Sequence, residues 1–328
     1  MSRLEVIIPA AGAGKRLRPH SHSVPKPLIH VAGKPILAHI LDEVEKLKPR
    51  KIIPVIGHKA SQMEEYIGKR AKGLYEPVYQ PEPKGIGHAV WLAGSRLSGG
   101  PLLVILGDTI FKADLEAVIK RNRSAIAVKP VADPSRFGVV EVRNGRITKV
   151  TEKPKRPRSN LAIVGIYYLE DSQPLLAELD NLISSGKCTK GEFQFTDGLS
   201  AMINHGHRLG TFRISGWYDC GTVSATLDAN ADILSLNGGN NRRIKGSMVL
   251  EPSFVDRTAK VVGSVIGPHT SVAAGAIVSS CIIRSSIVEE NARITNAILQ
   301  RSIVGRSAVI DGKASMVNIS ELSELSNL

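Results

Sequence analysis

The stretch Glu5–Pro19 reads EVIIPAAGAGKRLRP and decides the fold of the first half of the chain. Its apolar start is typical of a strand buried on both faces, and the glycines and basic residues that follow suit a loop that cradles an anion. A Walker A loop needs other residues where Ala10 and Arg16 stand, and a dinucleotide fingerprint needs Gly where Leu17 stands. The loop therefore predicts an anion site of another class.

From this loop to about residue 240, short apolar runs alternate with amphipathic stretches, which predicts an α/β fold. The expected strands are Glu5–Ala11, Lys51–Ile56, Leu102–Leu106 and Arg208–Ile214, and the expected helices are Pro35–Lys46, Ser61–Arg70, Pro174–Ser184, Thr196–Asn204 and Val223–Leu236. Closely spaced strands replace this alternation between residues 125 and 169, where Asn144-Gly145 predicts a hairpin turn. We therefore expect a mostly parallel sheet, covered by helices on both faces and joined by further strands.

A polar stretch, Asn237–Asn241, precedes a tail in which branched aliphatic residues recur with spacings of 6, 6 and 4 residues. This 16-residue unit is made by Ile266, Val272 and Val278, then by Ile282, Val288 and Ile294, then by Ile298, Val304 and Ile310. Stacked triangular coils explain the register, because each aliphatic column fills one interior edge. The repeat resembles the hexapeptide-repeat left-handed β-helix, with about three coils over residues 247–317 and a frayed end at Ser315–Leu328. Two domains are predicted, residues 1–240 and 241–328.

Composition narrows the class of protein. Of 328 residues, 42% are hydrophobic and 22% are charged, which is ordinary for a globular chain. No apolar run approaches the roughly 18 residues of a membrane helix, and the cysteines are too few and too widely spaced for a disulfide framework or a zinc site. The net charge is +13, yet the few aromatic residues do not alternate with basic ones, as they would on a single-strand binding surface. We expect a soluble, cytoplasmic protein that binds neither nucleic acid nor a membrane.

Several motifs, in order along about 230 residues, resemble those of the sugar-1-phosphate nucleotidylyltransferases. They are Gly12-x-Gly14-x-Arg16-Leu17-x-Pro19, Pro25-Lys26-Pro27-Leu28, Gln80-Pro81 with Gly85, Leu106-Gly107-Asp108, Phe137-Gly138-Val139-Val140, Glu152-Lys153-Pro154, Gly165 and Trp217-Tyr218-Asp219-Cys220-Gly221-Thr222. The resemblance implies a Rossmann-like nucleotidyltransferase domain with a mixed sheet, followed by the short left-handed β-helix. The implied reaction is attack of a sugar-1-phosphate on the α-phosphorus of a nucleoside triphosphate, which releases pyrophosphate.

The resemblance also assigns roles to residues. Arg16 and Lys26 are expected to neutralise the triphosphate and the departing pyrophosphate, and Asp108 and Asp219 are expected to hold Mg²⁺ together. The expected nucleotide-binding residues are Ala11, Gly12, Gly14, Gln80 and Gly85, and the expected sugar-phosphate residues are Gly138, Glu152, Lys153 and Gly165. No catalytic base is required, because the attacking phosphate oxygen is already an anion.

The choice of substrates is less determined. A Gln amide offers a donor and an acceptor, which suits uracil or thymine, so dTTP or UTP with glucose-1-phosphate is the favoured pair. Mannose-1-phosphate with GTP, and a non-catalytic regulatory subunit, are the alternatives. Ser200 stands where the short thymidylyltransferases have Arg, which weakens an assignment to that form. The β-helical tail likewise points to the long form, or to relatives such as the ADP-glucose and GDP-mannose synthesising enzymes. Short repeat stacks need capping or neighbours, so a homo-oligomer is expected. The loop histidines His20, His22, His205 and His207 are expected to be solvated.

Overall fold

The computed structural model describes residues 4–70, 73–240, 242–312, 318–319 and 324–326. The chain divides into two compact units, and each is built from two separate segments. Unit 1 comprises residues 1–12 and 40–217, and unit 2 comprises residues 13–39 and 218–328. From Ala13 onward, the glycine-rich loop after the first strand therefore belongs to the same unit as the C-terminal repeats.

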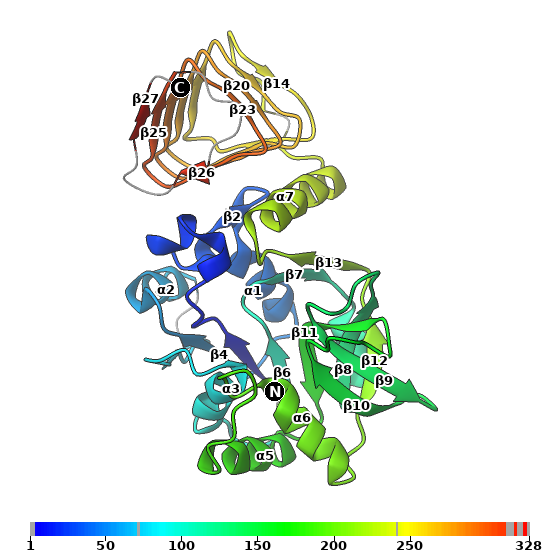
Figure 1. Ribbon diagram of the computed structural model, residues 1–328. Helices are drawn as coiled ribbons and strands as arrows, with labels where there is room; N and C mark the ends of the chain where they lie inside the picture. The colour runs from blue at the N-terminus through cyan, green and yellow to red at the C-terminus, as the bar shows by residue number, and fades with distance from the viewer. Residues whose placement is uncertain (1–3, 71–72, 241, 313–317, 320–323, 327–328) are drawn as a thin grey trace. The chain divides into compact units, whose positions relative to one another are not determined.

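Unit 1 is built on a mixed nine-stranded sheet in the order β10-β9-β11-β6-β1-β4-β5, with β8 pairing with β11 and β12 (Figure 1). The strands are β1 (Glu5–Pro9), β4 (Lys51–Ile56), β5 (Val78–Tyr79), β6 (Leu102–Ile105), β8 (Ala125–Pro130), β9 (Gly138–Arg143), β10 (Arg146–Glu152), β11 (Leu161–Leu169) and β12 (Gly210–Arg213). Strands β6, β1, β4 and β5 are parallel, whereas β11 runs antiparallel to β6, β8 and β9. The expected α/β fold with a mixed sheet is confirmed.

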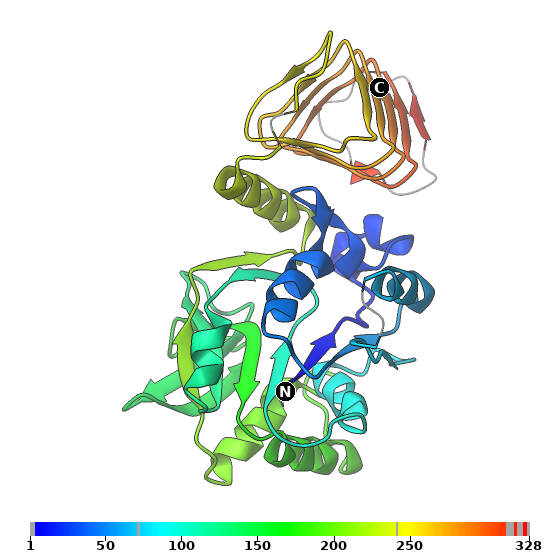
Figure 2. The same cartoon turned by 180° about the vertical axis from the view of Figure 1, so that it is seen from behind.

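Helices cover this sheet. They are α1 (Ile36–Lys46), α2 (Ala60–Gly68), α3 (Ile86–Gly94), α4 (Leu115–Lys120), α5 (Gln173–Ser184) and α6 (Phe195–Asn204). Val90 of α3, Leu175 of α5 and Leu199 of α6 belong to one buried cluster with Ile7 and Val104 of the sheet. Figure 2 shows the α1 helix in front of the parallel strands. In the described part of the chain, no helix combines the length and the apolar character that a bilayer span requires.

The predicted helices α1, α2, α5 and α6 are confirmed to within a few residues, and the hairpin at Asn144-Gly145 is confirmed as well. Asn144 and Gly145 have φ values of 51° and 73°, the left-handed conformation that a tight hairpin turn of this type demands. The helices α3 and α4 were not predicted. The α3 sequence IGHAVWLAG is apolar nearly all round, so no amphipathic period marks it.

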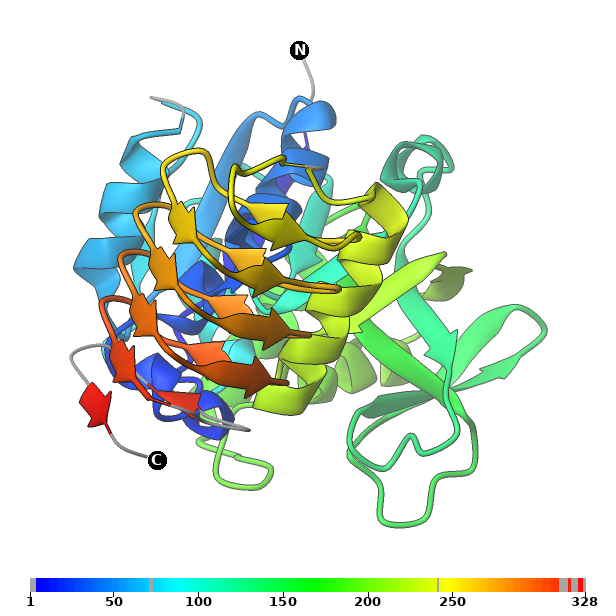
Figure 3. The same ribbon diagram turned by 90° about the horizontal axis from the view of Figure 1, so that it is seen from above.

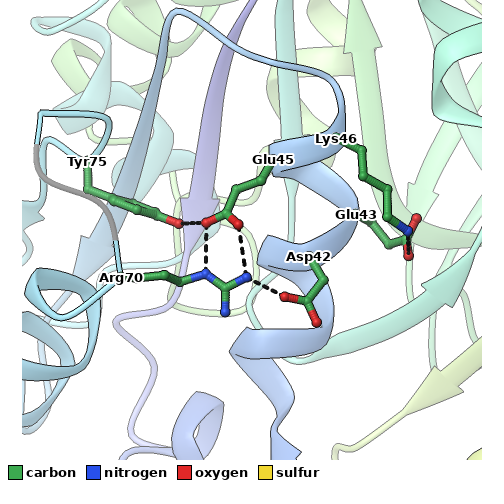
Figure 4. Close-up of polar contacts among 6 residues, drawn as sticks. All are labelled: Asp42, Glu43, Glu45, Lys46, Arg70 and Tyr75. Atoms are coloured by element: carbon green, nitrogen blue, oxygen red, sulfur yellow. Dashed lines mark hydrogen bonds and ion pairs between the residues drawn. The ribbon is translucent and has the colours of Figure 1, made fainter.

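An ionic cluster ties α1 to α2 and to the segment before β5 (Figure 4). The Arg70 guanidinium donates to both oxygens of Glu45, over 2.7 and 3.0 Å, and also to Asp42. The hydroxyl of Tyr75 donates to Glu45. The hydrogen bond from Arg70 holds the pKa of Glu45 below its ordinary value. The cluster joins elements of unit 1 and contains none of the predicted site residues, so we interpret it as structural.

Unit 2 contains three parallel sheets whose strands stack from coil to coil (Figure 3), and the coils are triangular in outline (Figure 1). The first sheet holds β14 (Met248–Val249), β17 (Val265–Ile266), β20 (Ile282–Arg284) and β23 (Ile298–Gln300), and the second holds β15 (Phe254–Val255), β18 (Ser271–Val272), β21 (Ile287–Val288), β24 (Ile303–Val304) and β26 (Asn318–Ile319). The third holds β16 (Lys260–Val262), β19 (Ile277–Ser279), β22 (Arg293–Thr295), β25 (Val309–Asp311) and β27 (Glu324–Ser326). This is the arrangement expected of a left-handed β-helix, and that prediction is confirmed.

The stack holds more coils than the three predicted, although its first strands lie within the predicted span of residues 247–317. Strands β14, β15 and β16 form a coil before the three predicted ones, and β26 and β27 continue two of the sheets beyond them. The prediction of a frayed end at Ser315–Leu328 is therefore wrong for residues 318–319 and 324–326, which pair with β24 and β25. The remaining residues of that segment lie outside the described ones.

One predicted aliphatic column is displaced by one residue. Ile266, Ile283 and Leu299 pair in register and fill the interior, whereas Ile282 and Ile298, which were predicted to lie inside, are 36% and 48% exposed. The reason is a coil of 17 residues between Ile266 and Ile283, after which the 16-residue period to Leu299 resumes. Because successive side chains of a strand point to opposite faces, a shift of one residue exchanges inside and outside.

The N-terminal segment of unit 2 packs on the repeats together with α7 (Val223–Asn237). This segment contains the 3₁₀ turns η1 (Lys15–Leu17), η2 (His20–His22) and η3 (Lys26–Leu28) and the short strands β2 (His30–Val31) and β3 (Lys34–Pro35). The buried amide of Asn230 on α7 accepts from the backbone N–H of Ala32 over 2.9 Å and from the hydroxyl of Ser271 over 2.7 Å. The same amide donates to the carbonyl of His269 over 3.0 Å. One side chain thus joins the loop segment to the β-helix.

A buried ion pair makes a second link between these two parts of unit 2. The Glu289 carboxylate accepts from the backbone N–H of His30 over 2.8 Å and lies 2.7 Å from Nδ1 of the same residue. Burial disfavours the charged imidazole, but the Glu289 carboxylate overrides it and raises the pKa of His30. Burial likewise opposes the Glu289 charge, and the facing His30 lowers the pKa of that carboxyl. Nearby His20 is also buried, so the expectation that it is a solvated loop residue is wrong.

Candidate active site

The carboxyl ends of the parallel strands in unit 1 bring together loops that the motifs singled out. Ala11 follows β1, and Gln80 follows β5. A Cβ on Gly57 would lie 2.7 Å from the backbone oxygen of Gln80 and 2.9 Å from the Cβ of Ala11, so the two loops touch there. Apart from Gly12 itself and its two chain neighbours, no atom of the described residues lies within 4 Å of the place that a Cβ on Gly12 would take. Ligands of open α/β sheets bind at this edge, which is therefore the candidate site.

Gln80 and Gly85 lie together in front of α3. Gln80 is only 4% exposed, and its side-chain nitrogen donates to the carbonyl of Gly85 over 3.2 Å. Gly85 has a φ of 104°, and a Cβ there would lie 2.6 Å from the carbonyl oxygen of Phe193. Only glycine fits such a position, which allows the backbone to turn tightly beside the Gln80 amide.

Asp108 lies at the same edge, just after β6. The N–H of Gly107 donates to the last residue of β1 over 3.0 Å, and the N–H of Leu106 donates to the carbonyl of Gly165 in β11 over 2.9 Å. These bonds fix the turn that carries Asp108 and set Gly165 directly beside it. Thr109 places its hydroxyl 3.4 Å from the Asp108 carboxylate.

A carboxylate and an ammonium group lie side by side at the end of β10. The Glu152 side chain is mostly buried, accepts from the hydroxyl of Thr196 over 3.2 Å, and lies 3.4 Å from Nζ of the more exposed Lys153. A Cβ on Gly138 would lie 3.3 Å from the same carboxylate. A fixed acceptor next to a solvent-accessible cation can bind sugar hydroxyls and a phosphate respectively.

The pKa of Tyr167 in β11 is affected by the negative charges at this edge. Its pKa is raised first by burial and then by the negative charges of Glu152 and Asp108. Both carboxylates therefore act on one buried ring. Such concentrated negative charge would be relieved by a bound cation or by the basic groups that accompany a phosphate.

In unit 2, the glycine-rich loop folds back on itself. Gly14 has a φ of 61°, and a Cβ there would lie 3.1 Å from the Cβ of Lys26 and 3.2 Å from that of Ser21. The Ser21 hydroxyl donates to the carbonyl of Gly14 over 2.9 Å. Lys26 is 7% exposed although it is charged, and it lies between Pro25 and Pro27 in η3. The loop thus holds a lysine in a fixed position, which suits recognition of a phosphate.

Arg16 and Asp219 are brought together within unit 2. Asp219 ends β13 (Gly216–Asp219), and the N–H of Gly221 donates to its carboxylate over 3.0 Å. A Cβ on Gly221 would lie 2.9 Å from that carboxylate and 3.0 Å from a guanidinium nitrogen of Arg16. Thr222 then caps α7 by accepting from the N–H of Ala225 over 3.3 Å. Two residues 203 positions apart in sequence therefore share one turn.

The carboxylates of Asp108, in unit 1, and of Asp219, in unit 2, are each chemically suited to magnesium. Among the described residues, no three or more His, Cys, Asp or Glu side chains gather closely enough to hold a metal by themselves. Mg²⁺ does not need such a group, because it commonly takes one or two carboxylates and completes its shell with water and substrate phosphates. Asp108 and Asp219 supply hard oxygen donors of this kind.

Several residues at these places were not predicted. Thr196 binds Glu152, Ser21 binds the carbonyl of Gly14 in the glycine-rich loop, and His88 contacts Gln80. The pKa of Tyr167 is raised by two of the carboxylates. Lys190 donates to the carbonyl of Lys153 over 3.0 Å. The sequence around each of these residues gave no sign of a role, and only tertiary contacts identify them.

Comparison with known proteins identifies the class. The family model described as nucleotidyl transferase matches residues 5–235. A glucose-1-phosphate thymidylyltransferase of Streptomyces antibioticus is 27% identical over 94% of this chain and 93% of its own length. The UTP–glucose-1-phosphate uridylyltransferase AglF of Haloferax volcanii is 32% identical over 65% of this chain and 89% of its own length.

Two further matches extend the comparison. The bifunctional protein GlmU of Methanococcus maripaludis strain C5 is 34% identical over 77% of this chain, and the matched region spans 61% of GlmU. A solved structure of UDP-glucose pyrophosphorylase with UDP-glucose covers 71% of this chain at 24% identity, with a TM-score of 0.62, and shows the same fold. Together with the family match, the relatives establish that this chain belongs to the nucleotidyl transferase family as a sugar-1-phosphate nucleotidyltransferase.

Proposed function

We propose that this enzyme transfers a nucleotidyl group from dTTP or UTP to glucose-1-phosphate in the cytoplasm, giving the sugar nucleotide and pyrophosphate. The observation that carries the proposal is a buried Gln80 beside Gly85 at the sheet edge that also bears Asp108. This combines an amide able to read a base with a carboxylate able to bind a metal. Relatives that transfer thymidylyl and uridylyl groups support the same pair.

The reaction is a displacement at phosphorus. An anionic oxygen of glucose-1-phosphate forms a bond to the α-phosphorus while the bond from that phosphorus to the β-phosphate oxygen breaks, and pyrophosphate leaves with the electron pair. Catalysis then depends on bringing anions together and on stabilising their charge. In this proposal Arg16 and Lys26 neutralise the triphosphate and the leaving pyrophosphate.

The remaining residues position the substrates. The backbone of Ala11, Gly12 and Gly14 approaches the triphosphate, Glu152 accepts from sugar hydroxyls, and Lys153 binds the sugar phosphate. Asp108 and Asp219 would hold Mg²⁺, which when bound would draw negative charge from the phosphate oxygens. Gly138 and Gly165 let the backbone pack closely against Ile163 and Leu106, and in this proposal their main chain lines the sugar-phosphate site.

Pyrophosphate release tests this assignment. The full chain is assayed with five triphosphates and several sugar-1-phosphates, with and without Mg²⁺. We expect the highest kcat/KM with dTTP or UTP and glucose-1-phosphate, and none after chelation of Mg²⁺. No turnover with any pair would contradict the reaction. A preference for GTP with mannose-1-phosphate would contradict only the choice of substrates.

We also propose that the enzyme is a homo-oligomer assembled through the β-helix. The first sheet of the stack carries a row of apolar residues that pair from strand to strand: Met248 with Val265, Val265 with Ile282, and Ile282 with Ile298. Met248, Ile282 and Ile298 are exposed. An exposed apolar ladder of this kind is typical of an interaction surface. Light scattering should give the mass of an oligomer for the full chain, and the Ile282→Lys/Ile298→Lys double variant should be smaller. Equal masses would contradict this interface.

A further inference from the structure

The side-chain amide of Gln80 is bound by two protein groups. Its nitrogen lies 3.2 Å from the carbonyl oxygen of Gly85 and 2.8 Å from Nδ1 of His88, which belongs to α3. Because a carbonyl oxygen can only accept, the amide nitrogen must lie on this side, and both of its N–H groups are used. Within the described part of the chain no hydrogen bond reaches Oε1 of Gln80, so that oxygen is the group left for a ligand.

The contact with His88 requires a neutral imidazole. Nδ1 can accept from the Gln80 amide only when it carries no proton, and the proton of the ring is then on Nε2. Burial lowers the pKa of His88, nearby Lys84 lowers it further, and Glu82 opposes them. These influences favour the neutral, accepting form near pH 7.

Aromatic side chains hold the imidazole ring in place. It stacks on Trp91 of the same helix with centroids 5.8 Å apart, and on Phe193 with centroids 6.3 Å apart. The carbonyl of Phe193 also accepts from the N–H of Gly87 over 2.9 Å. Two segments of unit 1 that are far apart in sequence therefore fix the orientation of His88.

We propose that His88 is a positioning residue that commits the nitrogen of Gln80 to the protein, so that only its carbonyl oxygen reads the nucleoside base. The proposal rests on the proposed function, in which Gln80 contacts the base. A lone acceptor pairs with the imino N–H of uracil, thymine or guanine. It meets a lone pair at N3 of cytosine or N1 of adenine, and should disfavour both.

A Gln80 amide with only its oxygen available recognises a base differently from a free amide. A free Gln amide could rotate to offer either a donor or an acceptor, and it would then tolerate all bases about equally. An amide fixed by His88 discriminates, because a wrong base leaves two acceptors facing each other without a proton. UTP against CTP, and GTP against ATP, are matched pairs that share ring size and differ at this position.

Two variants test the proposal. His88→Phe keeps a stacking ring but removes the acceptor, whereas His88→Asn keeps an acceptor near the place of Nδ1. His207→Phe, at an exposed histidine, is the matched control. Dissociation constants of UTP, CTP, GTP and ATP are measured by calorimetry with Mg²⁺, independently of turnover. Steady-state kinetics with the best substrate pair follow.

The wild-type chain should bind UTP and GTP more tightly than CTP and ATP. In His88→Phe these preferences should fall about tenfold, as expected for one misdirected hydrogen bond. The KM for the triphosphate should rise while kcat changes little, and His88→Asn should recover most of the preference. A merely structural role of His88 would not produce that recovery.

An unchanged preference in His88→Phe, or equal behaviour of the Phe and Asn variants, would overturn the proposal. A wild-type chain that binds all four triphosphates alike would also overturn it. Failure of the proposed function is distinguishable from these outcomes. In that case the base preference and its loss in His88→Phe would be observed, but no sugar-1-phosphate would release pyrophosphate.

Discussion

Replacing Glu289 with alanine should strongly destabilise unit 2. The carboxylate accepts from the N–H of His30 over 2.8 Å and contacts its ring nitrogen over 2.7 Å, and both residues are buried. The variant leaves two buried donors without this acceptor, and each costs about 1–3 kcal/mol. Breaking a buried ion pair from one side costs about 3–5 kcal/mol, which agrees with that sum. We therefore expect the free energy of unfolding to fall by about 3 kcal/mol or more at pH 6, measured by urea unfolding followed by circular dichroism.

The loss should depend on pH in a defined direction. Because the pKa of His30 is raised above its ordinary value of 6.5, its contribution is complete below pH 6.5 and is lost as the pH rises through the raised value. Because the pKa of Glu289 is lowered from 4.5, its contribution is present above pH 4.5 and is lost as the pH falls through the lowered value. The difference in free energy of unfolding between the wild-type chain and Glu289→Ala should thus be largest between pH 4.5 and 6.5 and should become smaller toward pH 9.

Glu116→Ala is the matched control, because Glu116 and Lys120 form an ion pair one helical turn apart on the exposed surface of α4. Its unfolding midpoint should equal that of the wild-type chain. A loss below about 1 kcal/mol in Glu289→Ala at pH 6 would refute the reasoning, since a buried pair should cost well above that. An equal loss at pH 6 and pH 9 would refute the assigned role of the imidazolium.

Three further predictions follow from the site and the repeats. Asp108→Asn should lower kcat at least a hundredfold while the unfolding midpoint is retained, because one preorganised charge contact is typically worth about 10²–10³ in rate; near-normal turnover at saturating Mg²⁺ would contradict the assignment of Asp108. Ile283→Ala should cost about 2–5 kcal/mol in urea unfolding, as expected for a cavity in a packed core, and Ile282→Ala much less; equal losses would mean that the register described here is wrong. Truncation after Asn237 removes the contacts of Glu289 with His30, so we expect lower stability and lower turnover, and a smaller assembly by light scattering. An unchanged oligomer with unchanged stability would contradict the roles given to the Glu289–His30 contact and to the β-helix in assembly.

The local sequence pattern was sufficient to predict most strands of the sheet and most helices of unit 1. The strand Lys51–Ile56 was predicted with its observed bounds, because a short apolar run between polar turns has few alternatives. The helix α3 was missed because its sequence lacks a polar face. In the repeats, two adjacent isoleucines, Ile282 and Ile283, offered equal hydrophobicity, and only the pairing of the strands decides which one lies inside.

The candidate site likewise combines residues that the sequence predicted with contacts that it could not predict. Resemblance of motifs predicted residues such as Gln80 and Asp108, and the structure describes their surroundings; their roles stay predictions. Their supporting contacts were not accessible from the sequence. His88 meets Gln80 only once the chain has turned at Gly85 and formed α3, and Thr196 meets Glu152 across 44 positions. Such contacts depend on tertiary packing, which no local pattern records.

The discontinuity of unit 2 has a consequence for synthesis of the protein. Residues 13–39 leave the ribosome early, and the segment 218–328 that completes their unit follows only after residues 40–217. At roughly 5–20 residues per second, this interval lasts on the order of 10–40 seconds. When that interval ends, 72 further residues must still be added before Glu289 exists, so the apolar side chains of the glycine-rich segment have no finished core to join for longer still. A late stop codon would therefore yield a chain whose glycine-rich loop is fully translated but has nothing to fold against.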